Sequence, residues 1–225
     1  MLGYQGRTAM TTRRQIIKII AGLGLWVFIT RLKSGISLAW ARTQKRLLAR
    51  DTPMEELISE DPGDLDTRQL DTTPMDRFDV MGQDIYEVNL DAWRLNLAGA
   101  VARPRALTYP ELVTQPFLEK NCLLICPGFF AYNALWKGIA LSSLLKSAGV
   151  DPKANRVRFS GPEGIRKKNE TFDLQDVMAD RVFIAYRVNG QPLPERHGFP
   201  ARVVAEGHYG GRWVKYVNRI HVLVD

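Results

Sequence analysis

Short apolar runs separated by polar turns recur through the second half of the chain, and they predict strands joined by a few short helices. Residues 93–99 alternate between apolar and polar side chains, which indicates a strand with one buried face. Residues 123–126, 157–159 and 182–188 predict further strands, because each is a short run with apolar side chains. We therefore expect the regular fold to begin near residue 93.

Two short helices are predicted from local patterns in this half of the chain. Thr108 and Glu111 are three residues apart, the spacing of a capping box, so a helix should continue through residues 112–113. Residues 173–178 indicate a single helical turn. Both segments are too short to form a core alone, so they should serve as connections between strands.

A longer amphipathic helix is predicted over residues 141–148. Gly149 follows it, and glycine readily takes the left-handed conformation that ends a helix. We expect a turn at residues 136–138 to lead into this helix. Further along, Asn189-Gly190 is a strong signal for a tight turn after the strand 182–188.

Residues 42–77 lack such patterns. The segment is polar, rich in Asp, Thr and Pro, and low in apolar periodicity, so we expect an extended lead-in that lies across the domain surface. The first piece expected to pack is Arg77-Phe78-Asp79-Val80. We therefore place the start of the folded domain at residue 78 and its end at residue 225.

The first 41 residues resemble a twin-arginine export signal. Arg13 and Arg14 lie in a basic segment, residues 19–30 form an apolar run, and Ala39-Trp40-Ala41 is a small-x-small cleavage site. The apolar run is shorter than the ~20 residues that span a bilayer comfortably. We expect export to the periplasm in the folded state, and the alternative is an uncleaved membrane anchor.

The distribution of charge argues against nucleic-acid binding. The chain has 31 basic and 24 acidic residues and a formal net charge of +7. The first 41 residues contain no acidic residue and six basic ones, namely Arg7, Arg13, Arg14, Lys18, Arg31 and Lys33. The rest of the chain is therefore almost neutral, with 25 basic residues against 24 acidic ones.

The two cysteines, Cys122 and Cys126, are not expected to form a disulfide. On one strand, at ~3.3 Å per residue, their Cα atoms would lie about 13 Å apart. Their spacing also differs from zinc-knuckle and c-type haem patterns. Cys126 should therefore be a free thiol at the end of a strand, followed by the chain-breaking Pro127-Gly128. A buried, structural cysteine is the alternative reading.

A cationic, glycine-rich stretch near the C-terminus suggests a site for a phosphate or pyrophosphate. Gly207, Gly210 and Gly211 allow backbone N–H groups to approach an anion closely. The positive charge around this turn would come from Arg202, Arg212 and Lys215, with His197 nearby. A glycine-rich hairpin with exposed arginines is the structural alternative.

Together these stretches resemble the sulfite-oxidase-like molybdopterin-binding oxidoreductases, including single-domain periplasmic members similar to the catalytic subunit of methionine sulfoxide reductase. The resemblance runs from Phe78 to Val224. It depends on three groups of residues: Trp93-Arg94-Leu95 with Gly99 and Pro104, then Cys126 with Trp136 and Gly138, then His197-Gly198-Phe199-Pro200-Ala201-Arg202 with Tyr209, Gly210 and Lys215.

The resemblance implies an α+β fold of the sulfite-oxidase type, with mixed β-sheets and short helices. It implies a molybdenum–molybdopterin cofactor and makes Cys126 the thiolate ligand of the metal, a role that suits a soft donor. Tyr132 and Tyr209 become hydrogen-bond donors beside the metal, or residues that simply pack. The implied cofactor-binding residues are Arg77, Phe78, Ser160, His197, Arg202, Tyr209, Gly210, Arg212, Trp213, Val214 and Lys215.

The expected activity is a two-electron oxygen-atom transfer on a small-molecule substrate. A separate electron-transfer partner, either a cytochrome or a membrane quinone-linked haem protein, would exchange single electrons with the domain. The chain ends at Asp225, before any dimerisation or haem domain, so we expect a monomer.

Two departures from the family pattern motivate an alternative function. Residues 127–130 differ from the family after the cysteine, and Glu206 places an acid beside a site meant for an anionic cofactor. The alternative is a non-enzymatic periplasmic binding or assembly module that keeps the fold without the metal.

Overall fold

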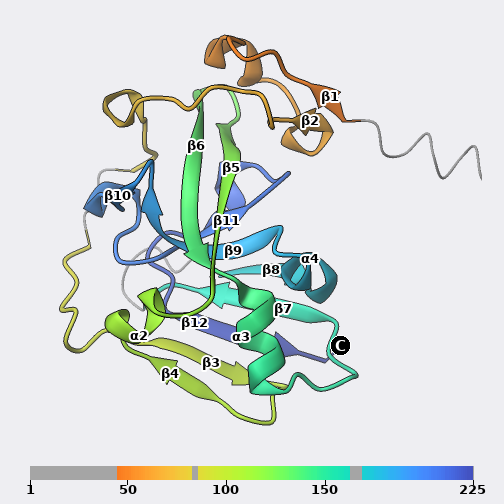
Figure 1. Cartoon of the computed structure of the whole chain (residues 1–225), viewed down its shortest axis with the longest axis vertical. Helices are drawn as coiled ribbons and strands as arrows, with labels where there is room; N and C mark the ends of the chain where they lie inside the picture. Colours follow the sequence, from red (N-terminus) through yellow and green to blue (C-terminus); the bar gives the residue numbers. More distant parts are fainter. Residues whose placement is uncertain (1–44, 83–85, 163–168, 225) are drawn as a thin grey trace, which may run out of the picture. The chain divides into compact units, whose positions relative to one another are not determined.

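The structure is a computed structural model that describes residues 45–82, 86–162 and 169–224 (Figure 1). The predicted export signal, residues 1–41, lies outside the described residues. Within those described residues, no helix has both the length and the apolar character needed to cross a membrane.

The first of two five-stranded sheets is antiparallel and is built around a long hairpin. Its strands are β5 (Phe117–Cys126), β6 (Phe130–Ile139), β9 (Val182–Val188), β10 (Gln191–Pro192) and β11 (Arg202–Ala205). The order is β10-β9-β6-β5, and β11 also pairs with β9. Asn189 and Gly190 take φ angles of 47° and 75° between paired strands β9 and β10, which confirms the predicted tight turn.

The second sheet collects strands from both ends of the domain. Its order is β4-β3-β12-β7-β8, formed by β3 (Leu95–Gly99), β4 (Arg105–Leu107), β7 (Arg156–Ser160), β8 (Asn169–Asp173) and β12 (Arg219–Leu223). Strand β12 runs parallel to β3 and antiparallel to β7, so this sheet is mixed. The C-terminal strand β12 thereby joins β3, near the start of the domain, to β7, in its middle.

The predicted helices are present with the expected end signals. Thr108 and Glu111 form the capping box of α2 (Tyr109–Val113). Helix α3 (Leu141–Ala148) ends at Gly149, whose φ is 70°. Helix α4 covers Leu174–Met178. These short helices and the mixed sheets confirm the predicted α+β class.

The turn predicted at residues 136–138 is wrong, because strand β6 continues through it. Gly138 lies where β6 crosses β9, at a register shift between Lys137 and Gly138. A Cβ atom at Gly138 would lie 2.1 Å from the carbonyl oxygen of Ile184. Glycine is therefore needed here for close approach of two strands rather than for a turn.

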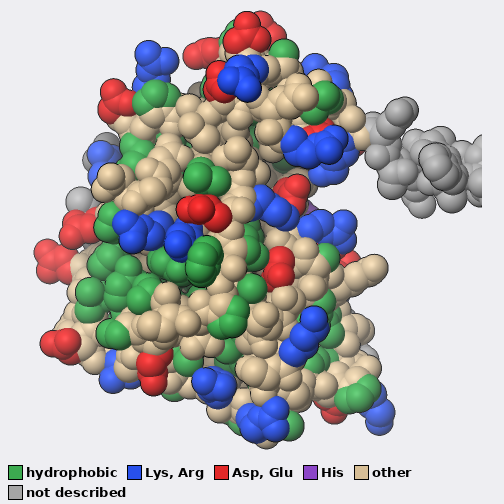
Figure 2. Space-filling view, in the orientation of Figure 1, with side chains coloured by type: hydrophobic (Ala, Val, Ile, Leu, Met, Phe, Trp, Pro, Cys, Tyr) green, Lys and Arg blue, Asp and Glu red, His purple; other side chains and the backbone are tan. Residues whose placement is uncertain are grey.

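The main hydrophobic core lies between the two sheets and includes Trp136, Trp213, Phe159 and Phe183, each at most 1% exposed. On the molecular face seen in Figure 2, acidic and basic side chains are interspersed rather than separated by sign.

The lead-in is more structured than its sequence predicts. It forms two short strands, β1 (Arg46–Leu47) and β2 (Leu65–Asp66), with three 3-10 turns: η1 (Met54–Leu57), η2 (Pro62–Asp64) and η3 (Met75–Arg77). Four of its leucines are buried against the hairpin residues Leu123, Ile125 and Ala131, namely Leu48, Leu57, Leu65 and Leu70. Packing therefore begins well before residue 77, and this small second core covers the side of the β5–β6 hairpin that faces away from the main core.

Candidate cofactor and active site

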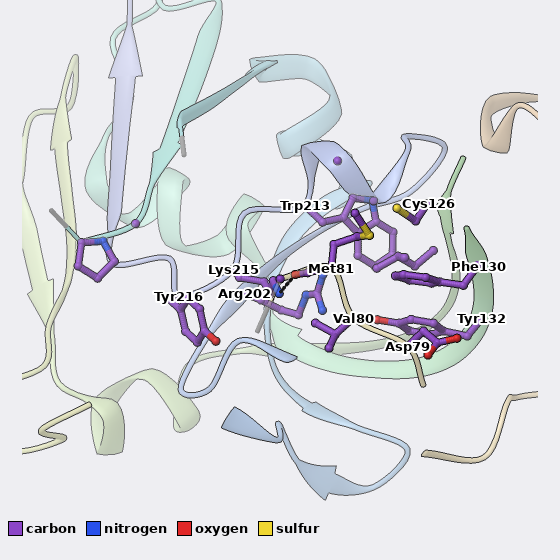
Figure 3. A pocket seen from close by; sticks show the side chains of 16 residues that line it. Asp79, Val80, Met81, Cys126, Phe130, Tyr132, Arg202, Trp213, Lys215 and Tyr216 are labelled. Atoms are coloured by element: carbon purple, nitrogen blue, oxygen red, sulfur yellow. Dashed lines mark hydrogen bonds between the residues drawn. The ribbon is translucent and has the colours of Figure 1, made fainter. Parts of the chain in front are cut away.

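A pocket of about 250 Å³ lies at the end of the β5–β6 hairpin. Its walls come from Asp79–Gly82, the ends of β5 and β6, the residues after β7, and the segment that leads from β11 to β12. Figure 3 shows Cys126 and Tyr216 at opposite ends of the view, with Arg202 and Lys215 between them. The pocket therefore has a thiol on one side of its cationic side chains and a tyrosine on the other.

Cys126 is placed by the tip of the hairpin. It is the last residue of β5 and pairs with Phe130, so Pro127, Gly128 and Phe129 form the connection, with φ of 75° at Gly128. The N–H of Gly128 donates to the carbonyl of Ile58 at 3.0 Å, which attaches the tip to the lead-in. Cys126 forms no disulfide, is half-buried and lines the pocket.

Cys122 has a different environment on the same strand. It is 1% exposed and free, so the prediction that the two cysteines form no disulfide is confirmed. Burial strongly raises the pKa of its thiol, with a smaller contribution from the nearby charge of Glu206. Cys122 thus has the properties of a packing residue, while Cys126 faces the pocket.

Arg202 is a fully buried cation whose charge has no carboxylate counterpart among the described residues. Its side chain is 3% exposed, and its guanidinium lies 5.1 and 5.6 Å from the ring centroids of Trp136 and Trp213, which contact each other edge-to-face. Nη1 donates to the carbonyl of His197 at 3.0 Å, whereas Nε has no partner among the described residues. Burial lowers the pKa of the guanidinium, but arginine remains protonated in proteins, so the site favours an anion.

Tyr132 points its hydroxyl group into the same region. Its ring stacks on Phe78 with centroids 4.2 Å apart, and it lies nearly parallel to Phe130 at 6.1 Å. Burial raises the pKa of its phenol, partly offset by the charge of Arg202 and a hydrogen bond with it. The hydroxyl is therefore a protonated donor at neutral pH.

His197 lies directly behind this group of side chains. It is 8% exposed, and its ring lies edge-on to both Phe78 and Tyr132. Burial, reinforced by the positive charges of Arg202, Lys215 and Arg196, lowers the pKa of His197 to about 4. The imidazole is therefore neutral at physiological pH, and its buried Nδ1 has no hydrogen-bond partner among the described residues.

Lys215 and Tyr216 form the other end of the pocket. Lys215 Nζ donates to the carbonyl of Met81 at 3.0 Å, which links the two walls. Tyr216 is a non-glycine residue with φ of 58°, a conformation that is strained for most side chains and common at ligand sites. Both residues line the pocket.

The glycine-rich segment brings backbone close to β5. A Cβ atom at Gly210 would lie 2.8 Å from Cδ2 of Leu124, so any other residue here would require the Leu124 side chain to shift. Gly211 has open space where a Cβ would be, and both glycines line the pocket. Trp213 is fixed by a hydrogen bond from its indole N–H to the carbonyl of His208 at 3.0 Å.

The structure brings together six of the predicted site residues as pocket lining, and it places Phe78 and His197 directly behind them. The six are Cys126, Tyr132, Arg202, Gly210, Trp213 and Lys215. Phe78 stacks on Tyr132, and the His197 carbonyl accepts from Arg202.

Five other predicted residues lie outside the lining. Arg212 is engaged with β8, where its guanidinium pairs with Glu170 at 3.2 Å, contacts His208 Nδ1 at 3.1 Å and covers the ring of Phe172. Ser160 lines a shallow cleft elsewhere on the second sheet. Arg77 lines a neighbouring groove, Tyr209 is 36% exposed, and Val214 is buried in the main core.

Glu206 does not face the pocket. Its carboxylate pairs with Lys120 at 2.9 Å on strand β5, and it is absent from the pocket lining. The acid that departs from the family pattern is therefore neutralised by a neighbouring cation.

Several lining residues were not predicted from the sequence. Phe130 lines the pocket because it is the cross-strand partner of Cys126, and Met81 does so because Lys215 attaches to its carbonyl. Gly161 and Pro162 line it directly after β7, next to the predicted Ser160. Pro127-Gly128 is the sequence signal that could have identified Phe130. A hairpin turn there would place Phe130 opposite Cys126.

Comparison with known proteins identifies the class of protein that this fold and pocket define. The sequence model of the oxidoreductase molybdopterin binding domain matches residues 82–225, and the chain therefore belongs to this family. The sulfite-oxidase-like class and fold are thus confirmed, and molybdopterin with molybdenum is the cofactor of the family.

Relatives of this chain include much longer proteins. The inducible nitrate reductase [NADH] 2 of Glycine max is 32% identical over 163 residues, and the nitrate reductase [NADPH] of Phytophthora infestans is 34% identical over 159 residues. Each alignment covers 59% of this chain but 18% of the relative.

A similar solved structure is the sulfane dehydrogenase SoxCD from Paracoccus pantotrophus, with 28% identity and a TM-score of 0.58. The match covers 63% of this chain and 40% of that one. The chain thus corresponds to one part of each of these larger proteins.

The residues present fit the cofactor of the family. A soft thiolate donor faces one end of the pocket, as a molybdenum ligand requires. Nε of Arg202 and Nδ1 of His197 are buried and have no hydrogen-bond partner among the described residues, and such atoms require a polar or anionic partner. The glycine-rich wall leaves backbone accessible to a phosphate.

Proposed function

We propose that this chain is an exported molybdenum oxidoreductase that carries out two-electron oxygen-atom transfer, with Cys126 as the protein ligand of the metal. The observation that carries the proposal is a half-buried thiol in one pocket with a buried guanidinium that has no carboxylate partner among the residues that the structure describes. When bound, the cofactor would move one oxygen atom and two electrons between substrate and metal and exchange these electrons singly with a separate carrier.

The residues of the chain have distinct roles in this proposal. Arg202 and Lys215 hold the phosphate of the cofactor, and the backbone of Gly210 and Gly211 approaches it closely. Nδ1 of the neutral His197 makes a hydrogen bond to a polar atom of the pterin.

Tyr132 is proposed as a hydrogen-bond donor beside the metal ligand. Its hydroxyl group stays protonated because burial raises its pKa, and the stack with Phe78 fixes the direction of the ring. Arg77, Ser160, Tyr209, Arg212 and Val214 remain predicted cofactor contacts. Of these, Arg212 would have to leave its pairing with Glu170 before it could bind the cofactor through its side chain.

Export and the electron partner complete the proposal. Residues 1–41 support export through the twin-arginine route in a folded state, which suits a cofactor inserted before transport. A cytochrome or a membrane quinone-linked haem protein would be the electron carrier. Detection of the protein in the periplasmic fraction, and its retention in the cytoplasm when Arg13 and Arg14 are both replaced by Lys, would test the route.

The metal content of the protein tests the central part of the proposal. The protein is purified from a host that makes molybdopterin and from one that does not, and molybdenum is measured by mass spectrometry. We expect stoichiometric molybdenum in the first sample and none in the second. A folded, stable and metal-free protein from the first host would contradict the proposal and favour a non-enzymatic binding or assembly module.

A further inference from the structure

A second cavity adjoins the pocket at its thiol end. This groove has a volume of about 540 Å³ and lies between the lead-in and the tip of the β5–β6 hairpin. Asp79 and Phe130 line both the groove and the pocket. Because Phe130 is the cross-strand partner of Cys126, the two cavities meet beside the strand end that carries the thiol.

The groove has a hydrophobic floor and one exposed aromatic wall. Met54, Ile58, Phe130 and Ala131 line it, and Phe129 at the hairpin tip lines it while 69% exposed. Phe129 therefore adds exposed apolar surface beside the apolar residues that line the groove. The groove can therefore contact an apolar group of at least several carbon atoms.

The charges that line the groove are mainly negative. Among the described lining residues, Arg50 and Arg77 are the cations, and the carboxylates are Asp51, Glu55, Asp71 and Asp79. Arg50 and Asp71 form an exposed ion pair at 3.8 Å. The remaining carboxylates outnumber the remaining cation, which is the opposite of the pocket, where Arg202 and Lys215 supply positive charge.

Most of the groove is built by residues that precede the part of the chain matched by the family model. The lead-in contributes residues 50–58 and 71–79, whereas the match begins at residue 82. The hairpin contributes residues 129–131, of which Phe129 and Phe130 lie in the stretch that departs from the family pattern. Most of the groove therefore lies outside the part of the chain that the family model matches.

We propose that this groove binds the non-reacting part of the substrate, and that it favours an uncharged or cationic apolar substituent over an anionic one. The proposal rests on the proposed function, in which the reacting atom is next to the metal on Cys126. Hydrophobic burial on the floor provides affinity, and the surplus of carboxylates discriminates by charge. A small oxyanion would reach the metal without any help from the groove.

Inert probes test the groove without requiring turnover. Methyl phenyl sulfone is neutral and already fully oxidised at sulfur, and its para-aminomethyl and para-carboxylate derivatives differ from it in charge. Their binding to the molybdenum-loaded protein is measured by calorimetry. We expect the aminomethyl sulfone to bind about two- to tenfold more tightly than the carboxylate, the range that a few exposed charge pairs provide, and the preference should shrink as salt is added.

Removing carboxylates from the groove should reduce this discrimination. In the double variant Asp51→Asn, Glu55→Gln, the ratio between the affinities for the cationic and anionic sulfones should fall from its wild-type value towards one. The affinity for the neutral sulfone should stay unchanged. Asp91→Asn is the matched control, because Asp91 is an exposed carboxylate outside the groove and its variant should keep the wild-type ratio.

Phe129→Ala tests the apolar wall separately. It should weaken binding of all three sulfones by a common factor, because the ring contacts the part of the probe that they share. Phe117→Ala, which removes another exposed ring outside the groove, should leave all three affinities unchanged.

Several outcomes would overturn the inference. Equal binding of the three probes, tighter binding of the carboxylate, or no binding of any probe would each do so. The proposed function fails by a different measurement, the absence of molybdenum in the same samples. A molybdenum-loaded protein that binds the charged sulfones equally would therefore refute the proposal for the groove alone. A metal-free protein that still prefers the cationic sulfone would refute the proposed metal site alone.

Discussion

The pocket and the groove meet at Phe130, yet they differ in charge and in the sequence that builds them. The pocket contains the buried Arg202 and Lys215, and most of its walls come from the part of the chain matched by the family. The groove carries mainly carboxylates, and most of its walls come from the lead-in. The difference separates a surface suited to an anionic cofactor from one suited to a neutral or cationic group.

The pocket and the lead-in that lines the groove also differ in what they contribute to stability. A buried cation without a carboxylate partner costs free energy in the folded protein unless a ligand compensates it. The lead-in is different, because its leucines add a small core of their own against the hairpin. We therefore expect changes in the pocket to act on cofactor binding and changes in the lead-in to act on stability as well.

The largest effect on the pocket is expected for Arg202→Met. Molybdenum content should fall at least about tenfold, the scale on which loss of a group that supports a metal site acts. The free energy of unfolding of the metal-free protein should be unchanged or higher by up to about 3 kcal/mol, because a buried uncompensated charge is replaced by an apolar side chain. Metal analysis and urea unfolding measure the two effects.

Arg105→Met is the control for that experiment, because Arg105 is exposed on the edge strand β4. It should leave molybdenum content and stability unchanged. Full metal loading of the Arg202→Met protein would contradict the claim that the positive charge of the pocket binds the anionic cofactor.

Removing a lead-in leucine should destabilise the domain. Leu57 is 1% exposed in the core shared with Ile125, so Leu57→Ala should lower the free energy of unfolding by about 2–5 kcal/mol. Leu47→Ala is the matched control, since Leu47 is 48% exposed and should change stability little. Equal effects of the two substitutions in urea unfolding would show that the lead-in is not part of the folded unit.

The depressed pKa of His197 predicts a specific pH dependence of stability. Between its ordinary value near 6.5 and about 4, the unfolded chain binds a proton that the folded chain does not. Stability should therefore fall as the pH falls through this range, by at most about 3 kcal/mol from this group. His197→Gln should flatten the profile in metal-free protein.

His221→Gln is the control for the pH profile, because His221 lies on the exposed face of β12. Urea unfolding at pH 4.5 and pH 7.5 measures both variants. An unchanged slope in the His197→Gln protein would contradict the assigned burial of this imidazole.

The smallest effect is expected for the ion pair between Lys120 and Glu206. Both side chains are about one-third exposed, so Glu206→Gln should lower stability by roughly 0.2–1 kcal/mol. Molybdenum content should stay the same, because the carboxylate lies outside the pocket lining. A rise in metal loading in this variant would indicate that Glu206 opposes the anionic cofactor after all.

The sequence predicted local structure where the signal lies in adjacent residues. The capping box at Thr108, the glycine that ends α3 and the Asn189-Gly190 turn depend on backbone conformations that a few residues determine. The position of Cys126 at a strand end followed from Pro127-Gly128 in the same way. The resemblance to the family then indicated Arg202 and Lys215, which do line the pocket.

Features that depend on distant residues were not predictable in this way. The lead-in leucines Leu48, Leu57, Leu65 and Leu70 have no regular spacing, because irregular backbone presents them to a sheet surface. Gly138 signals close approach to Ile184, a contact that no local pattern records. The engagement of Arg212 with Glu170 likewise depends on where β8 lies.

The coordination of molybdenum by Cys126 is the central claim, and X-ray absorption at the molybdenum edge tests it most directly. The wild-type protein and Cys126→Ser are produced in the same molybdopterin-competent host and compared at equal metal content. We predict that the variant loses one sulfur neighbour of the metal and that its paramagnetic spectrum changes. Identical sulfur coordination and an identical paramagnetic spectrum in the two proteins would contradict the claim.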